Sequence, residues 1–231
     1  MKRSQSLLLF EWFKSLTKKL KGKAMALQNR VNPKGELHAV SSRGLFMGNK
    51  GRLHNQNKEI IRKQATNGWV ICALSHKGIK RELMSESYTE LFFLDEATAL
   101  SAGHRPCNDC LKDKFIEFKQ RWVDVNNNEN TNITTMAEIN KFNQKERYNR
   151  GEKVTFKENA QNLPSGTFIE IEQNFYLIWQ GLKYLWSFDG YKAKSVIKSE
   201  EVTVLTPRSF VNVLSSGYIP EVHNSIEAVP I

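Results

Sequence analysis

The alternation of hydrophobic and polar positions predicts strands in two parts of the chain. Residues 69–74 and 88–94 are apolar and rich in β-branched or aromatic side chains, which predicts two strands, as a hairpin or a sheet edge, around a basic turn. Beyond residue 164 the apolar runs become short and are separated by turn residues, which predicts a small antiparallel meander. Its expected strands are residues 167–172, 175–180 and 183–188, with a further strand at 202–205.

Periodic apolar positions predict helices between these strands. Asp95 occupies the N-cap position of a short helix, and Gly103 is placed to end it. From Leu111 to Trp122 apolar residues recur every three or four positions, so an amphipathic helix is expected up to the Asn-rich run 126–132.

Three more helices are predicted. A mostly polar helix with one apolar face follows the Asn-rich run and ends by Gly151. A C-terminal helix is expected to have Thr206 as its cap, Pro207 in its first position and Gly217 after its end. Residues 1–25 predict a basic amphipathic helix, which we interpret as an extension of the folded body.

These elements predict an α+β protein with four parts. They are a basic amphipathic N-terminal extension (1–25), a module of short strands and helices (26–125), an Asn-rich linker and helix as a helical connector (126–163), and a small antiparallel β-rich C-terminal domain (164–231). The composition, 40% hydrophobic and 25% charged, agrees with a globular chain, and 231 residues can bury a core without disulfides. Every apolar run, including residues 7–10, is far shorter than the roughly 20 residues of a membrane span, so no transmembrane segment is expected.

The positive charge of the chain is concentrated in its first third. The formal net charge is +10. Residues 1–81 carry eighteen Lys and Arg against three Asp and Glu, whereas the rest of the chain carries sixteen against twenty-one. Such an asymmetry favours a polyanionic partner such as nucleic acid, with ordinary solubility as the alternative interpretation.

The cysteines indicate a reducing compartment and a metal. The chain has three cysteines, Cys72, Cys107 and Cys110, which is an odd number and too few for a disulfide framework. No convincing signal peptide precedes them, so a cytoplasmic location is expected. The Cys-x2-Cys spacing of Cys107 and Cys110 presents two thiolates to one metal ion, which is half of a zinc site. Redox dithiols share this spacing, but here the motif follows a helix and Pro106 precedes the first cysteine, which argues against a thioredoxin-like site.

The residues around this motif carry a family resemblance. Glu96-Ala97, followed by Ala102-Gly103-x-Arg105-Pro106-Cys107-x2-Cys110, resembles the second half of the zinc domain of Ada-type DNA methylphosphotriester repair proteins. The resemblance covers about residues 69–114. It implies that residues 26–125 form an Ada-like zinc module, with zinc as the cofactor. The whole chain also resembles uncharacterised bacterial proteins with a YTELFFLDEATA…AGHRPC signature, a resemblance that implies no activity.

The chain departs from the Ada pattern upstream of this motif. In the Ada domain an upstream Cys-x3-Cys pair supplies the other two zinc ligands, and one of them accepts the methyl group. The corresponding positions in this chain are Arg81 and Ser85. The resemblance therefore implies a zinc module that lacks the methyl-acceptor cysteine pair.

Completion of the zinc site requires another sulfur and a nitrogen. Cys72 is the only remaining cysteine that could supply the sulfur. Alternatively, Cys72 serves only as a small hydrophobic residue buried in the core. The nitrogen is expected from His54, which follows a Gly-Asn turn that resembles the one upstream of the cysteine pair in Ada-like modules. His76 is the alternative, although on an extended strand it would share a face with Cys72 without approaching it. His104 is a third candidate, or an orienting residue beside the motif.

The sequence thus predicts a zinc-binding protein that associates with nucleic acid, as a DNA-binding or DNA-repair-related module. DNA is favoured over RNA as the partner. Phosphate contacts are expected from basic residues in or near the predicted zinc module. They are Arg43, Lys50, Arg52, Lys77, Lys80, Arg81 and Arg105.

Two other functions are alternatives, and the sequence does not decide whether the protein is an enzyme. A metal-dependent nuclease or phosphodiesterase would activate water beside the metal, with His104, Glu90 and Asp95 as candidate catalytic residues. Helix capping explains Asp95 without catalysis. A structural zinc module for protein interaction is the other alternative. Aromatic residues of the C-terminal meander could stack on bases, but core packing is the preferred interpretation.

Overall fold

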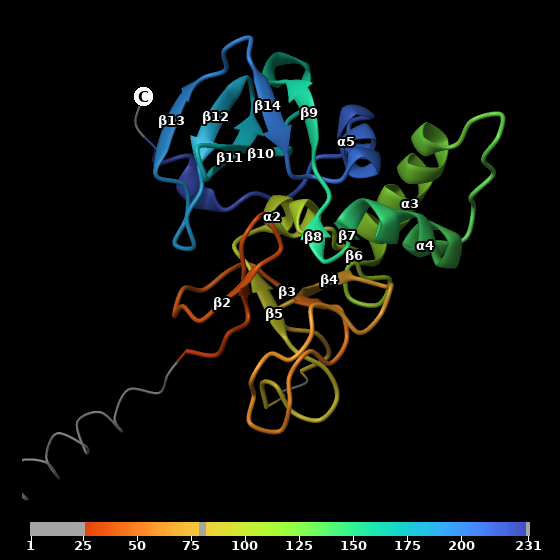
Figure 1. Cartoon of the computed structure of the whole chain (residues 1–231), viewed down its shortest axis with the longest axis vertical. Helices are drawn as coiled ribbons and strands as arrows, with labels where there is room; N and C mark the ends of the chain where they lie inside the picture. The colour runs from red at the N-terminus through yellow and green to blue at the C-terminus, as the bar shows by residue number, and fades with distance from the viewer. Residues whose placement is uncertain (1–25, 79–81, 230–231) are drawn as a thin grey trace, which may run out of the picture.

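The computed structural model describes residues 26–78 and 82–229, so the helix predicted within residues 1–25 lies outside the described residues. The described part contains two six-stranded sheets, a small two-stranded sheet and the helices α2 to α5 (Figure 1). Helix α2 (Glu96–Ser101) lies between the two sheets (Figure 1). The α+β fold class is therefore confirmed. No helix in these residues is both long and apolar enough to cross a membrane.

The first sheet is mixed and has the strand order β2-β1-β5-β3-β4-β6. Strand β1 pairs in parallel with β5, and β4 pairs in parallel with β6, whereas the other neighbours are antiparallel. The strands are β1 (Arg30–Val31), β2 (Leu37–His38), β3 (Phe46–Asn49), β4 (Val70–Ala73), β5 (Leu91–Phe93) and β6 (Arg105–Pro106).

The two strands predicted around the basic turn correspond to β4 and β5, but they do not form a hairpin. Strand β3 lies between them and pairs antiparallel with both. Gly48 makes room for this arrangement, because a Cβ at this position would lie 2.4 Å from Cε2 of Phe93. The sequence does not predict β3, because the strand lies in a Gly- and Asn-rich stretch that indicates turns.

Helices α2 and α3 follow their sequence signals. Asp95 caps α2 and accepts a hydrogen bond from the backbone N–H of Thr98. Gly103, with a φ of 87°, turns the chain directly after the helix, in the left-handed region that favours glycine. Helix α3 (Lys112–Asn126) buries Phe118 and Trp122, two residues of the predicted apolar face.

Helix α4 (Met136–Arg147) begins with a capping box and ends earlier than predicted. The Thr135 side chain accepts from the Glu138 backbone N–H, and the Glu138 carboxylate accepts from the Thr135 backbone N–H. After Arg147 the chain enters a small hairpin of β7 (Tyr148–Asn149) and β8 (Glu152–Lys153), so Gly151 belongs to that hairpin and not to the helix end.

The second sheet is antiparallel throughout and contains the predicted meander. Its order is β13-β12-β11-β10-β14-β9. Tyr184, Trp186 and Tyr191 are buried in its core, which confirms the core interpretation for these aromatic residues. The strands are β9 (Phe156–Asn159), β10 (Phe168–Ile171), β11 (Asn174–Trp179), β12 (Leu182–Leu185), β13 (Ala193–Val196) and β14 (Glu201–Val204), with short 3-10 helices at Ala160–Asn162 and Asn224–Ile226.

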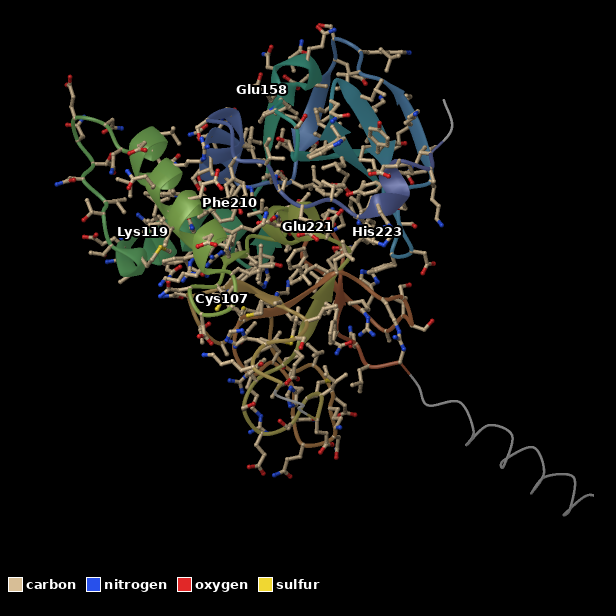
Figure 2. All side chains as sticks on the ribbon, turned by 180° about the vertical axis from the view of Figure 1, so that it is seen from behind. Cys107, Lys119, Glu158, Phe210, Glu221 and His223 are labelled. Carbon is tan, nitrogen blue, oxygen red and sulfur yellow. The ribbon has the colours of Figure 1, made fainter. Side chains whose placement is uncertain are left out.

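Helix α5 (Arg208–Ser215) returns from the second sheet to the core of the first. Phe210 points from α5 toward α3 (Figure 2), and its ring centroid lies 5.0 Å from that of Phe118. Thr206 does not cap this helix, because its hydroxyl accepts a hydrogen bond from the Phe168 backbone N–H of β10. The C-terminal part of the chain therefore contributes to the packing that supports α3.

Candidate metal centre

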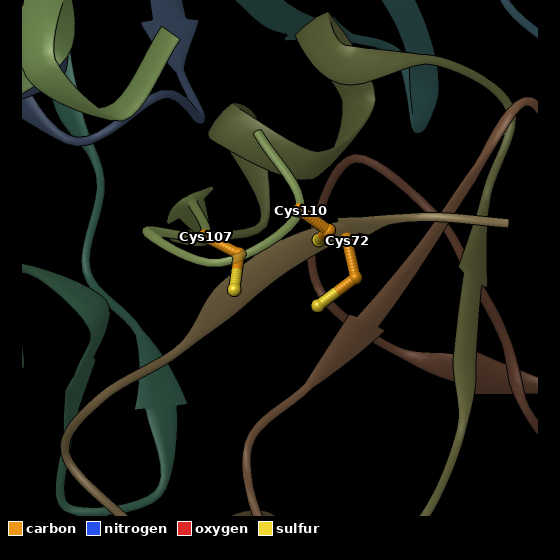
Figure 3. Close-up of side chains that lie close together, drawn as sticks. All are labelled: Cys72, Cys107 and Cys110. Carbon is orange, nitrogen blue, oxygen red and sulfur yellow. The ribbon is translucent and has the colours of Figure 1, made fainter. Parts of the chain in front are cut away.

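The three cysteines converge at the β6 edge of the first sheet. Cys72 lies in β4, Cys107 follows β6, and Cys110 lies just before α3. Their Sγ atoms all lie within 4.8 Å of one another (Figure 3). The structure thus brings together the three thiols that the sequence suggested as ligands.

Parallel pairing of β4 with β6 explains why these residues meet. Ile71 is in register with Pro106, and the Cys107 N–H donates to the Ile71 carbonyl over 2.9 Å. The next residue of each strand, Cys72 and Cys107, is therefore placed side by side. The Leu111 N–H then donates to the Cys107 carbonyl over 3.1 Å, which closes the turn that carries Cys110.

Backbone N–H groups point at two of the sulfurs. The Ala73 N–H donates to Sγ of Cys110 over 3.3 Å, and the Asp109 N–H donates to Sγ of Cys107 over 3.4 Å. Such donors stabilise a thiolate and orient a metal ligand. Reasoning from the sequence missed these backbone groups, since only the local backbone path shows where an N–H points.

The three thiols differ in acidity. A hydrogen bond from the Cys72 thiol is the largest factor that lowers the pKa of Cys107, to about 5. The same hydrogen bond, followed by burial, raises the pKa of Cys72, and burial raises that of Cys110. Cys107 is therefore the most readily deprotonated of the three thiols, and a metal ion would displace the protons that remain on the others.

His54 does not approach the cysteines. Its Nδ1 lies 2.6 Å from the Thr89 hydroxyl and its Nε2 lies 2.8 Å from the Ser85 carbonyl oxygen, so both ring nitrogens have partners. The side chain is buried at that place and is not part of the cysteine cluster found among the described residues. The sequence-based choice of His54 as the nitrogen ligand is therefore not supported by the geometry.

His76 lies closer to the motif than an extended strand would allow. Strand β4 ends at Ala73, so the chain turns before His76 and the face-sharing argument no longer applies. Nε2 of His76 lies 3.1 Å from a carboxylate oxygen of Asp109, which is inside the turn between Cys107 and Cys110. This Nε2 is buried and makes no hydrogen bond of normal geometry with the described residues.

The three candidate catalytic residues are buried and make contacts that stabilise the fold. His104 is fully buried, with ring centroids of Trp69 and Phe93 at 5.1 and 4.8 Å, and burial with nearby cations holds its pKa well below the usual range. Glu90 is buried and accepts a hydrogen bond from the Met84 N–H over 2.7 Å. Asp95 caps α2. None of the three belongs to the cysteine cluster found in the described chain.

The predicted phosphate-contacting residues do not share one environment. Lys50 and Arg105 are buried, and Arg105 donates to the Pro106 carbonyl. Arg43 is exposed, Arg52 is half-buried, and Lys77 is exposed in an ion pair with Asp109. The remaining two residues of the set, Lys80 and Arg81, lie outside the described residues.

Comparison with known proteins assigns no family to the chain. No protein-family model matches it, and neither a curated protein nor a solved structure does. The cysteine cluster is therefore interpreted from its own geometry. Three sulfurs at this separation could bind a metal ion, and their softness is consistent with zinc.

Proposed function

We propose that the protein binds one zinc ion through Cys72, Cys107 and Cys110. The observation that carries this proposal is the convergence of the three thiols from two strands and a helix start. Zinc sites built on sulfur and nitrogen are four-coordinate and tetrahedral, so three sulfurs leave one position to fill. A zinc ion there would tie β4 to the turn that leads into α3.

His76 is the proposed fourth ligand. Its Nε2 is buried beside the Cys-x2-Cys turn without a hydrogen bond of normal geometry. The imidazole is not part of the cysteine cluster found among the described residues, so it would have to move to reach the metal. Asp109 would then hold the histidine from the opposite side, as carboxylates do for many metal-bound imidazoles. His54 is a poorer choice because both of its ring nitrogens already have partners.

The functional role of this zinc module is proposed to be association with DNA. The Ada-like motif and the positive charge of residues 1–81 support it. Association is preferred to hydrolysis, because the three candidate catalytic residues are engaged in helix capping, backbone hydrogen bonding or aromatic packing. The module would serve to position its accessible basic residues, Arg43 and Arg52, for contact with DNA phosphates.

Metal analysis of the purified protein tests the zinc site. We expect about one zinc per chain in the wild type and none in Cys107→Ser, because loss of one thiolate removes a ligand from a site that has only three sulfurs. Cobalt substitution should give sulfur-to-metal charge-transfer absorption. His76→Gln should weaken zinc affinity about tenfold or more, whereas His54→Gln should not change it. A metal-free wild type, or a fully loaded Cys107→Ser variant, would contradict the proposal.

The salt dependence of DNA binding tests the proposed role. If phosphate contacts dominate, the logarithm of the association constant should fall linearly with the logarithm of salt concentration, by about 0.9 for each phosphate neutralised. Arg43→Gln and Arg52→Gln should each make this slope shallower by about one unit. Lys198→Gln, at an exposed position before β14, is the control. Affinity that is indifferent to salt would count against the role.

A further inference from the structure

A cavity of about 920 Å³ lies between the β1–β2 hairpin, the loop at residues 60–63 and the β7–β8 hairpin. None of its lining residues is a cysteine, so it is separate from the candidate metal centre. Its size falls within the roughly 300–1,000 Å³ typical of small-molecule sites. The basic residues that line it are Lys34, Lys50, Arg62, Lys63 and Lys153.

Lys50 is the most unusual of these residues. Its side chain is 1% exposed, and its ammonium lies 4.5 Å from the centre of the Trp69 ring. Within the described chain it makes no hydrogen bond and no ion pair, although it borders the cavity. Contact with the Trp69 ring offsets only part of the hydration that a buried ammonium loses, so the charge is costly unless an anion reaches it.

Other cations surround Lys50. Lys153 lines the cavity and donates to the Ser101 carbonyl, and Lys63 lines the cavity and donates to the Gly151 carbonyl. Arg147 is fully buried on the same Trp69 ring, 4.5 Å from its centre, and its Nη2 has no partner among the described residues. Carbonyl oxygens accept hydrogen bonds from these groups but do not neutralise their charge.

The carboxylates of the cavity do not compensate these charges. Glu170 pairs with Lys34 over 3.0 Å, and Glu36 lies 3.8 Å from His38. Glu152 is exposed, and no described carboxylate lies within ion-pair distance of Lys50, Lys153 or Arg147. Burial is the main reason why the pKa of both Lys50 and Lys153 is lowered to about 7. Repulsion by nearby cations adds to it, from Arg147 first for Lys50 and from Lys50 first for Lys153.

We propose that this cavity binds a phosphomonoester group, with Lys50 and Lys153 contacting its oxygens. A dianion matches several unpaired cations better than a single carboxylate does, and lysine is a common phosphate ligand as a point charge. The volume exceeds what phosphate alone would fill, and the Tyr148 side chain supplies a wall for the rest of a nucleotide-sized molecule. The phosphate belongs either to a free nucleotide or to the 5′ end of a strand. The proposal depends on neither the zinc site nor the nucleic-acid role.

Calorimetric titration with defined probes tests the proposal. Inorganic phosphate and adenosine 5′-monophosphate should bind to the wild-type protein at pH 6.5, whereas adenosine should not. A 5′-phosphorylated oligonucleotide that binds far better than its 5′-hydroxyl counterpart and better than the nucleotide would identify a strand end as the source. A nucleotide that binds as well as the oligonucleotide would identify a free ligand. No binding of any phosphorylated probe would overturn the proposal.

Variants separate a binding role from a structural one. Lys50→Met and Lys153→Met should each weaken binding of adenosine 5′-monophosphate by about tenfold or more. The control is Lys183→Met, which removes an ammonium that pairs with Glu200 over 3.1 Å on the other sheet.

Because methionine removes an unpaired buried charge, Lys50→Met should melt at the same or a higher temperature without ligand, and phosphate should no longer raise its melting temperature. Unchanged affinity in both lysine variants would overturn the proposal. Zinc content should not change in either.

Binding should also depend on pH. Because the phosphomonoester prefers the ammonium forms, affinity should fall as the pH rises through about 7, where Lys50 and Lys153 lose their protons in the free protein. Titrations with adenosine 5′-monophosphate at pH 7.5, 8.5 and 9.5, where the phosphomonoester itself is already a dianion, measure this fall at constant ionic strength. Equal affinity at all three would contradict the assignment of these lysines. The other charged or titratable groups around the two ammonium groups are Lys63, Arg147, His104, Tyr148, Glu36 and Glu152.

Discussion

Replacing Asp95 with alanine should lower the free energy of unfolding by about 4 kcal/mol, because four hydrogen-bond donors lose a buried carboxylate. One oxygen accepts from the N–H and the hydroxyl of Thr98, at 2.8 and 2.6 Å. The other accepts from the Tyr191 hydroxyl at 2.7 Å and the His223 N–H at 3.1 Å. The residue is fully buried, so water does not replace the lost acceptor.

Asp95→Asn is the matched control for this change. Asparagine keeps one oxygen for the Thr98 N–H, so it preserves the helix cap, but its NH2 group would face the His223 N–H. We therefore expect Asp95→Asn to lower the free energy of unfolding by about half as much as Asp95→Ala does. The comparison separates capping of α2 from anchoring of the C-terminal segment. Urea unfolding followed by circular dichroism measures both. An alanine variant within about 1 kcal/mol of wild type would show that the carboxylate does not hold these segments together.

Gly44→Ala should destabilise the first sheet by about 3 kcal/mol. A Cβ at this position would lie 1.7 Å from the carbonyl oxygen of Phe93 and 2.4 Å from its carbonyl carbon. Both are backbone atoms of β5, so no side-chain rotation relieves the clash. The backbone would have to separate where the Leu45 N–H now donates to the Leu94 carbonyl over 2.9 Å.

Gly68→Ala is the control for the glycine prediction. Its added Cβ would meet only the side-chain amide of Asn140, at 3.5 Å, which is ordinary contact. We expect its stability to be unchanged or slightly higher, because alanine restricts the unfolded chain. Thermal unfolding of the two variants measures the difference. Equal melting temperatures would mean that the approach of the 44–45 segment to β5 is not required for the fold.

Elements with strong local signals could be predicted from the sequence. Helix α2 has a capping aspartate and a terminal glycine, α3 has a regular apolar face, and the meander has alternating strands between turn residues. Strand β3 lacks such a signal, and its position between β4 and β5 depends on contacts between distant parts of the chain. The packing of α5 against α3 is likewise invisible to a reading of local patterns.

The candidate site divides in the same way. The Cys107–Cys110 pair is recognisable from its spacing alone, whereas Cys72 joins it only through strand pairing. The sequence favours His54 over His76 because of a motif and an assumed strand. The end of β4 at Ala73 and the partners of both His54 ring nitrogens support the proposal of His76 instead. The sequence also does not show that a lysine is buried. Lys50 would be expected at the surface, but it is buried and borders the cavity.

The pairing of β6 with β4 also bears on how long the protein would retain a metal ion. Strand β6 is two residues long and lies at the edge of its sheet, with a neighbour on one side only. Edge strands with few hydrogen bonds open more often than the strands they join. Each opening would separate Cys72 from the other two sulfurs and leave the ion on a two-sulfur fragment. The rate at which a chelator removes the ion would therefore depend on how often β6 separates from β4. Measuring this rate would report the local opening of the sheet edge.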